Sequence, residues 1–122
     1  METLVSRLEL PWPPSLNHYY RHVGPRVLIS KQGRDYRDAV AAKLASEGVR
    51  CMSGKISLTL DAYPPDNRRR DVDNLLKCLL DSLTGCLLLD DSQIKRLSIT
   101  MREPMHGNGG MIYLEAKPFT LR

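Results

Sequence analysis

Hydrophobic and polar positions along the chain follow two periods, and the two periods predict strands and helices in turn. Alternation at every second residue, or a short apolar run, predicts strands. These strands cover residues 3–10, 26–29, 56–61, 94–101 and 111–117. Apolar residues spaced by three and four predict helices over residues 31–47 and 72–84. The predicted order is strand, strand, helix, strand, helix, strand, strand.

Residues that start and stop helices support these boundaries. Ser30 is suited to cap the first helix and Gly48 to end it, while Gly85 is suited to end the second. The prolines that follow the first strand predict an ordered but irregular loop over residues 11–24. A glycine-rich turn at residues 107–110 predicts that the last two strands form a hairpin.

These elements define a small α/β or α+β domain with a mixed sheet and two helices, and one domain accounts for residues 1–122. The pattern leaves parallel and antiparallel pairing open. No apolar run approaches the roughly 18 residues of a membrane span. The first residues do not resemble a signal peptide, so we expect a cytoplasmic protein. Cys51, Cys78 and Cys86 lack metal-binding spacing and are expected to be reduced thiols.

Charge changes this picture at residues 67–77, which read N-R-R-R-D-V-D-N-L-L-K. If Asp71 precedes the helix, its carboxylate and that of Asp73 can share one metal ion near the helix N-terminus, where a phosphate is also favoured. Oxygen ligands select a hard ion such as Mg²⁺, which takes one or two carboxylates, water and substrate phosphate. Asp91, next to Asp90, can complete the site only if the apolar run at residues 87–89 spans the length of the helix.

Basic side chains supply the other half of this predicted site. Lys77 stands one turn after Asp73 and could neutralise charge on the reacting phosphate. Arg68, Arg69 and Arg70 could hold neighbouring phosphates, because a guanidinium binds phosphate through two hydrogen bonds. A net charge of +4 by itself indicates an acidic partner only weakly.

Each of these features also has a plain structural interpretation. Asp71 and Asp73 could simply cap the helix, the acids at residues 90–91 could form a turn, and the arginines could bind nucleic acid without chemistry. Residues 73, 77 and 81 could form a surface charge ladder. His18 and His22 lack a third ligand, which favours a structural or substrate-side role. The residues alone therefore leave open a metal-dependent phosphodiesterase, a non-catalytic DNA-binding module and a metal-dependent hydrolase of small phosphorylated substrates.

Three motifs together resemble the RusA-type Holliday junction resolvases. They read P-W-P-P-S-L-N-H-Y-Y-R-H from residue 11, P-D-N-R-R-R-D-V-D-N-L-L-K from residue 65 and L-D-D-S-Q-I from residue 89. Their order and spacing match the family along essentially the whole chain. The resemblance implies a homodimeric, Mg²⁺-dependent endonuclease of bacteria and their prophages, with Mn²⁺ as a substitute ion and no organic cofactor or membrane. Its expected role is recombination and repair, by symmetric paired cuts in four-way DNA junctions.

Position by position, the resemblance also implies residue roles. The essential acids correspond to Asp71, Asp73 and Asp91, the catalytic lysine to Lys77, and a supporting metal-binding acid to Asp90. A donor-rich segment with stacking rings precedes the first helix and adds candidate DNA contacts. The predicted DNA-binding residues are Asn17, Tyr20, Arg21, Arg68, Arg69 and Arg70.

Overall fold

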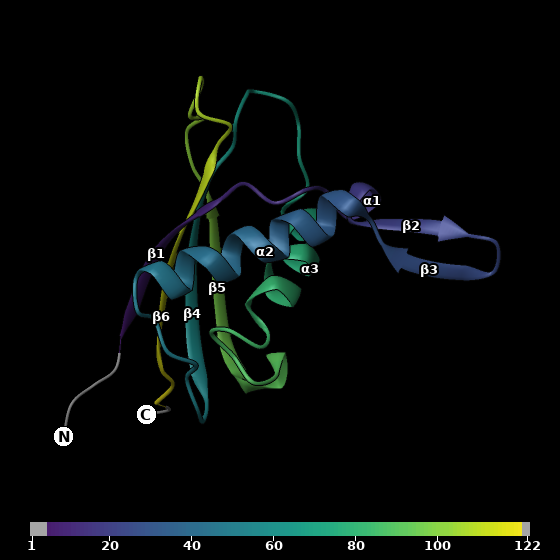
Figure 1. The fold of residues 1–122 in the computed structure, drawn as a ribbon. Helices are drawn as coiled ribbons and strands as arrows, with labels where there is room; N and C mark the ends of the chain where they lie inside the picture. Colours follow the sequence, from purple (N-terminus) through teal and green to yellow (C-terminus); the bar gives the residue numbers. More distant parts are fainter. Residues whose placement is uncertain (1–4, 121–122) are drawn as a thin grey trace.

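A mixed four-stranded sheet carries the fold, and two helices cover one of its faces (Figure 1). This computed structural model describes residues 5–120. The strands of the sheet are β1 (Ser6–Pro11), β4 (Ile56–Tyr63), β5 (Ile94–Met101) and β6 (Met111–Pro118). Their order is β1-β6-β4-β5, with β6 antiparallel to both neighbours and β4 parallel to β5. The predicted α+β class with a mixed sheet is confirmed.

The two long helices form where their apolar spacing predicts them. They are α2 (Lys31–Ser46) and α3 (Val72–Leu83). Ser30 caps α2, because its Oγ accepts a hydrogen bond of 3.0 Å from the Gly33 backbone N–H. Each helix buries one apolar face against alternate side chains of the central strands. This packing holds α3, and with it the predicted site, against the sheet.

The first strand forms close to where the alternation of apolar and polar residues predicts it. β1 covers Ser6–Pro11, against a prediction of residues 3–10, and residues 3 and 4 lie outside the described part of the chain. Leu8 and Leu10 are buried, as the alternation predicts. Strand ends shift by a residue or two because the first and last pairs depend on the neighbouring strand.

The prediction of an irregular loop over residues 11–24 was wrong in its second half. Residues Leu16–Tyr19 form a short helix, α1, and Tyr20–Val23 form β2, which pairs with β3 (Arg26–Ile29) in a separate two-stranded sheet. The run of prolines ends at residue 14, and the backbone N–H groups after it can form regular hydrogen bonds. Tyr19 N–H donates to the Ser15 carbonyl at 2.9 Å, and β3 supplies the partners of β2.

The predicted hairpin between the last two strands was also wrong. β6 lies between β1 and β4, while β5 lies on the far side of β4, so the two do not pair with each other. β4 is largely buried, and its backbone N–H and C=O groups are paired on both edges, with β6 on one side and β5 on the other. The connection through α3 places β5 parallel to β4 at the sheet edge. The glycine-rich turn therefore carries the chain across the end of β4 rather than into a hairpin.

The apolar run at residues 87–89 does not span the length of α3. The backbone N–H groups of Leu87 and Leu88 donate to the Leu83 carbonyl at 2.9 and 3.0 Å, so the run stays at the C-terminal end of the helix. A single 3-10 turn, η1 (Asp91–Gln93), follows it and leads into β5. Asp91 therefore enters the fold beside the C-terminal half of α3.

The structure also bears on the cysteines and on the question of a membrane span. Cys51, Cys78 and Cys86 are all free thiols, as their spacing predicts. Within residues 5–120, no helix has the length and apolar character needed to cross a membrane.

Candidate active site

The N-terminus of α3 presents the two acids that the sequence places there. Asp71 occupies the N-cap position in extended backbone conformation, and Asp73 lies in the first turn. The Asp71 side chain makes no capping hydrogen bond, so its carboxylate is not used to hold the helix end. Side-chain capping by Asp71 is therefore not the arrangement found. The free N–H groups and the helix dipole at this end favour bound anions such as phosphate.

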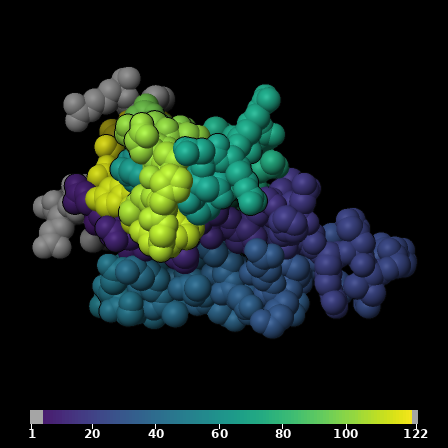
Figure 2. All heavy atoms as spheres, turned by 90° about the horizontal axis from the view of Figure 1, so that it is seen from above, coloured from purple at the N-terminus to yellow at the C-terminus, as the bar shows by residue number. Residues whose placement is uncertain are grey.

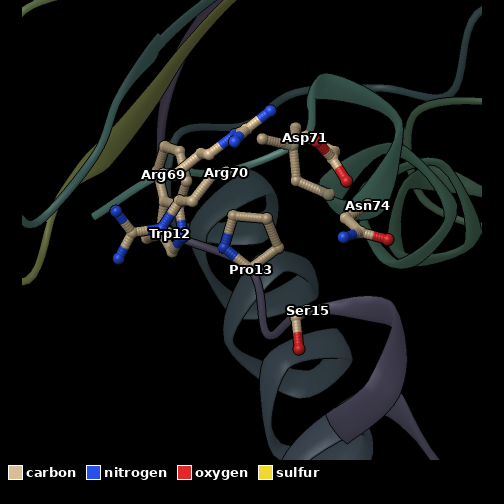
Figure 3. Close-up of a pocket in the computed structure, with 8 residues that line it drawn as sticks. Trp12, Pro13, Ser15, Arg69, Arg70, Asp71 and Asn74 are labelled. Carbon is tan, nitrogen blue, oxygen red and sulfur yellow. The ribbon is translucent and has the colours of Figure 1, made fainter. Parts of the chain in front are cut away.

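A cleft of about 400 Å³ opens in front of Asp71 (Figure 3). It lies between the start of α3, the arginine segment and the loop that follows β1. Its lining consists of Trp12, Pro13, Ser15, Arg69, Arg70, Asp71, Asn74 and Leu75. Figure 3 shows Asp71 and Asn74 on the α3 side of the cleft and Trp12 with the arginines on the other. The cleft thus combines the Asp71 carboxylate with guanidinium groups.

The three arginines do not share one role. Arg70 donates to Asp66 Oδ1 at 2.8 Å and its guanidinium carbon lies 5.6 Å from the Trp12 ring centroid, so it joins the segment to the loop after β1. Arg68 points outward with 84% of its side chain exposed, and Arg69 lines the cleft. The Arg68 Nε also lies 3.8 Å from Asp66 Oδ2, in an exposed ion pair of the kind that contributes little. Arg68 and Arg69 are therefore accessible to a phosphate, and Arg70 positions the segment.

Asp66 anchors this segment through its charge. Hydrogen bonds from the Arg70 side chain and the Arg68 backbone lower the pKa of the Asp66 carboxyl from 3.8 to about 2. Because the folded-state pKa is depressed, the stabilisation from ionised Asp66 is complete above the unfolded pKa near 4 and is lost as pH falls through about 2.

We expect the Asp66 carboxyl carbon to titrate near pH 2 in an NMR experiment and Asp66→Asn to remove that transition. The same substitution releases Arg70 from Asp66, so the fluorescence of Trp12, the only tryptophan in the chain, should change at neutral pH. Asp38→Asn, on the exposed surface of α2, is the matched control. Unchanged Trp12 emission in Asp66→Asn would show that Asp66 does not hold Arg70 in place.

Lys77 lies on the exposed face of α3, and its ammonium group is directed along the helix. Its Nζ is 3.2 Å from Asp81 Oδ1, and this contact raises the pKa of Lys77 above its usual range. Tyr20 Oη donates to the other oxygen of the same carboxylate at 3.5 Å. Of the predicted series of charged residues 73, 77 and 81, the contact between Lys77 and Asp81 is therefore formed. This contact keeps the lysine fully charged at neutral pH.

Asp91 lies in a second cleft, of about 280 Å³, beside the C-terminal half of α3. Arg37, Asp81, Thr84 and Asp90 line it together with Asp91. Asp91 is near enough to Lys77 to contribute, as the smallest of several causes, to the raised pKa of that lysine. The acid and the lysine thus lie on one side of the molecule.

Asp90 is engaged in the turn that precedes β5. The Ser92 hydroxyl donates to Asp90 Oδ2, and this hydrogen bond lowers the pKa of Asp90. The Gln93 side chain accepts hydrogen bonds from the backbone N–H groups of Leu89 and Asp90 at 2.7 and 3.0 Å. The turn interpretation of this acid is therefore confirmed, and its role as a metal ligand stays a prediction.

Of the four predicted metal-binding acids, Asp71 lines the first cleft, whereas Asp90 and Asp91 line the second. Within residues 5–120, no group of three or more histidine, cysteine, aspartate or glutamate side chains lies close enough together to hold one metal ion. Asp71 and Asp73 fit a Mg²⁺ ion that keeps most of its water, since such an ion needs only one or two carboxylates. The inclusion of Asp91 in the same ligand set stays a prediction.

The other predicted DNA contacts lie on α1 and β2, near the first cleft. Asn17 and Arg21 are exposed, and Tyr20 is half-buried because it packs on the core and reaches Asp81. His18 shares a 3.0 Å hydrogen bond with Ser15, and His22 is exposed on β2. The histidines therefore occupy different elements, in agreement with the interpretation that they do not form a metal pair.

Sequence reasoning gave no role in the site to Trp12, Asp66 or Asn74. Asn74 stands three residues after Asp71, a spacing that places it on the same side of the helix, so this residue could have been found. Asp66 stands four residues before Arg70, which is also a recognisable pairing distance. The contact of Trp12 with Arg70 joins distant parts of the chain and has no local signal.

Comparison with known proteins identifies the family of the chain. The sequence model of the family described as endodeoxyribonuclease RusA matches residues 11–114. Crossover junction endodeoxyribonuclease RusA of Escherichia coli K12 is 40% identical over 71% of this chain and 74% of its own length. The protein of the same name from Enterobacteria phage 82 is 42% identical over the same shares, and that from Shigella sonnei is 40% identical.

These matches define the class of the protein as a nuclease. The chain belongs to the RusA family of endodeoxyribonucleases. The family predicted from the three sequence motifs is therefore confirmed.

Proposed function

We propose that the protein is a Mg²⁺-dependent Holliday junction resolvase, which cuts four-way DNA junctions by paired phosphodiester hydrolysis. Its relatives are named crossover junction endodeoxyribonucleases. The observation that carries the proposal for this chain is the Asp71 carboxylate, which makes no capping hydrogen bond at the N-terminus of α3 and faces a cleft that Arg69 also lines. A carboxylate, a helix N-terminus and a guanidinium around one cleft suit a bound phosphodiester and a cation.

The proposed chemistry assigns a role to each side chain. Asp71 and Asp73 hold the ion, which when bound activates the attacking water, and Asp91 joins them as the third acid. Arg68 and Arg69 bind the phosphates on either side of the reacting one. Lys77, held charged by Asp81, stabilises the negative charge that develops on the phosphoryl oxygens.

The balance of the reaction is that of hydrolysis. The water oxygen forms a bond to phosphorus and the bond to the 3′ oxygen breaks. One proton of the water passes to solvent and the 3′ oxygen takes up one, which leaves 5′-phosphate and 3′-hydroxyl ends.

A homodimer is part of the proposal, because two coordinated cuts in opposite strands require two copies of one site, and a four-way junction has near-twofold symmetry. We further propose that the protein acts on DNA in the cytoplasm of a bacterial cell and that its gene came from a prophage. The relative in Enterobacteria phage 82 supports that origin.

Cleavage of a mobile four-way junction, compared with a linear duplex of the same sequence, tests the function. We expect cuts at symmetric positions in opposite strands when Mg²⁺ or Mn²⁺ is present, none in EDTA, and none in the duplex. Binding without cutting under either ion would favour a non-catalytic DNA-binding module. Release of phosphate from nucleotides, with no preference for branched DNA, would favour a hydrolase of small substrates.

A further inference from the structure

The hairpin of β2 and β3 extends away from the body of the protein (Figures 1 and 2). Its two strands pair only with each other and form a sheet separate from the main one. Val23 directly precedes the turn at its tip and Val27 is the second residue of β3, with 39% and 55% of their surface exposed. An isolated two-stranded ribbon with apolar residues at its tip buries little by itself, so it is suited to contact something else.

The base of the hairpin is firmly attached, so the direction of the ribbon is defined. Tyr20 and Ile29 pack against the core, and the Arg34 guanidinium donates to the Ile29 carbonyl at 2.8 Å. Gly33 of α2 lies so close that a Cβ there would come within 2.7 Å of the Tyr19 ring and 2.9 Å of the Ile29 side chain. α2 therefore supports the ribbon through a contact that a larger residue would break.

Charge identifies the chemistry of the partner. From Leu10 to Arg34 the chain contains no aspartate or glutamate, while Arg21, Arg26, Lys31 and Arg34 are cationic. Only Lys31 of these four forms an ion pair within the described residues, with Asp35. A surface with cations and no acids attracts a polyanion and repels a second copy of a chain that is itself cationic.

The pairing of the two strands sorts these side chains by face. Arg21 lies opposite Leu28 and Val23 opposite Arg26, so both arginines project from one face of the ribbon together with Val23. Val27 lies opposite His22 on the other face. A ribbon of two strands fits the major groove of DNA, and apolar side chains can insert where bases are unstacked.

The hairpin also begins at the candidate site. Tyr20, the first residue of β2, reaches the Asp81 carboxylate that holds Lys77. DNA that contacts the ribbon would therefore continue directly onto the exposed face of α3.

We propose that the β2–β3 hairpin is a DNA-binding arm that recognises the branch of the junction. Arg21 and Arg26 bind phosphates of one duplex arm, and Val23 and Val27 contact bases left unstacked where the strands exchange. The inference deepens the proposed function and rests on it, because branched DNA is the substrate it assumes.

Binding in EDTA, where no cutting occurs, tests the arm by fluorescence anisotropy against a four-way junction and a duplex. For Arg21→Ala/Arg26→Ala we expect the slope of log affinity against log salt to fall by about two and junction affinity to fall roughly tenfold. The matched control is Arg50→Ala/Lys55→Ala, which removes the same charge from the chain beyond the C-terminal end of α2. It should leave the salt slope and the junction affinity within about twofold of the wild type.

Val23→Ser/Val27→Ser keeps the charge and tests branch recognition. We expect duplex affinity to stay unchanged and the preference for the junction over the duplex to fall roughly tenfold. Thermal unfolding should be unaffected, because both valines are exposed.

Two results would overturn the proposal that the hairpin is a DNA-binding arm. The first is an Arg21→Ala/Arg26→Ala variant that binds DNA with the affinity and salt dependence of the wild type. The second is a hairpin variant that changes its oligomeric state on ultracentrifugation while its DNA binding stays intact. That second result would make the hairpin a contact between subunits. Cleavage of the junction by the wild-type protein in Mg²⁺ distinguishes failure of the proposed nuclease function from failure of the proposed DNA-binding arm. A wild type that cuts junctions while the arm variants bind normally refutes only the arm. Loss of binding in those variants, with no cutting by the wild type, refutes only the nuclease function.

Discussion

Asp71→Asn is expected to slow junction cleavage at least about a hundredfold while junction affinity stays within about twofold. The substitution keeps the shape of the side chain and removes the charge that a metal ion requires. Because the Asp71 side chain makes no capping hydrogen bond, and asparagine is as good an N-cap as aspartate, α3 should not be destabilised. Single-turnover cleavage with saturating Mg²⁺, together with binding in EDTA, measures the two quantities.

This substitution separates catalysis from helix capping. If Asp71 served only as a cap, asparagine would replace it with full activity, and cleavage at the wild-type rate would therefore refute its role in the site. Asp38→Asn, which removes one exposed acid from α2, controls for the change in net charge and should cut normally. Equal unfolding temperatures for the two variants would exclude a folding defect as the cause.

Gly110→Ala should have the largest effect on stability, a loss of about 3 kcal/mol in the free energy of unfolding. Gly110 has a φ of 83°, in the left-handed region that other residues disfavour. A Cβ there would also meet the Pro65 nitrogen and the Tyr63 carbonyl oxygen at 2.8 Å, and backbone atoms cannot move aside cheaply. Urea denaturation measures the loss.

A neighbouring glycine provides the matched control. Gly107 has a φ of 90° but no atom within 4 Å of the added Cβ, so Gly107→Ala should cost only the conformational strain, about 1 kcal/mol. Equal losses in the two variants would show that the contact with Pro65 contributes nothing. Because Pro65 leads directly into the arginine segment, Gly110→Ala should also reduce cleavage, whereas Gly107→Ala should not.

Elements with a strong local period were predictable. α2 and α3 differ from the predicted ranges only at their C-terminal ends, since apolar spacing, Ser30 and Gly85 all act within a few residues. β4 was predictable for the same reason. The free thiols and the family were also correct, the latter because three motifs agree in order and spacing.

Pairing between strands was not predictable from the last two strands alone. The glycine-rich turn at residues 107–110 is a good hairpin signal, yet β6 pairs with β1 and β4. β4 is largely buried, so its backbone N–H and C=O groups need hydrogen-bond partners on both edges, and β5 and β6 supply them. The short α1 and β2 were missed because their hydrogen-bond partners come from Ser15 and β3, not from a regular apolar pattern.

The candidate site shows the same division between local and distant information. The sequence identifies Asp71, Asp73 and Lys77, because their spacing on and before one helix decides which way they face. It does not reveal that Arg70 is held by Asp66 and Trp12 while Arg68 lies largely exposed beside the same carboxylate, since charge alone does not distinguish them. Nor does it reveal that the run after α3 leaves Asp91 beside Asp81.

By itself, then, the sequence determined the two long helices, most of the strands, the family and the chemical character of residues 67–77. All of these depend on neighbours close in the chain or on motifs read in order. The tertiary structure decided the strand order, the different contacts of the three arginines, the placement of Asp71 and Asp91 in different clefts, and the projecting hairpin. These depend on which distant surfaces bury each other, and burial is a property of the whole packed chain.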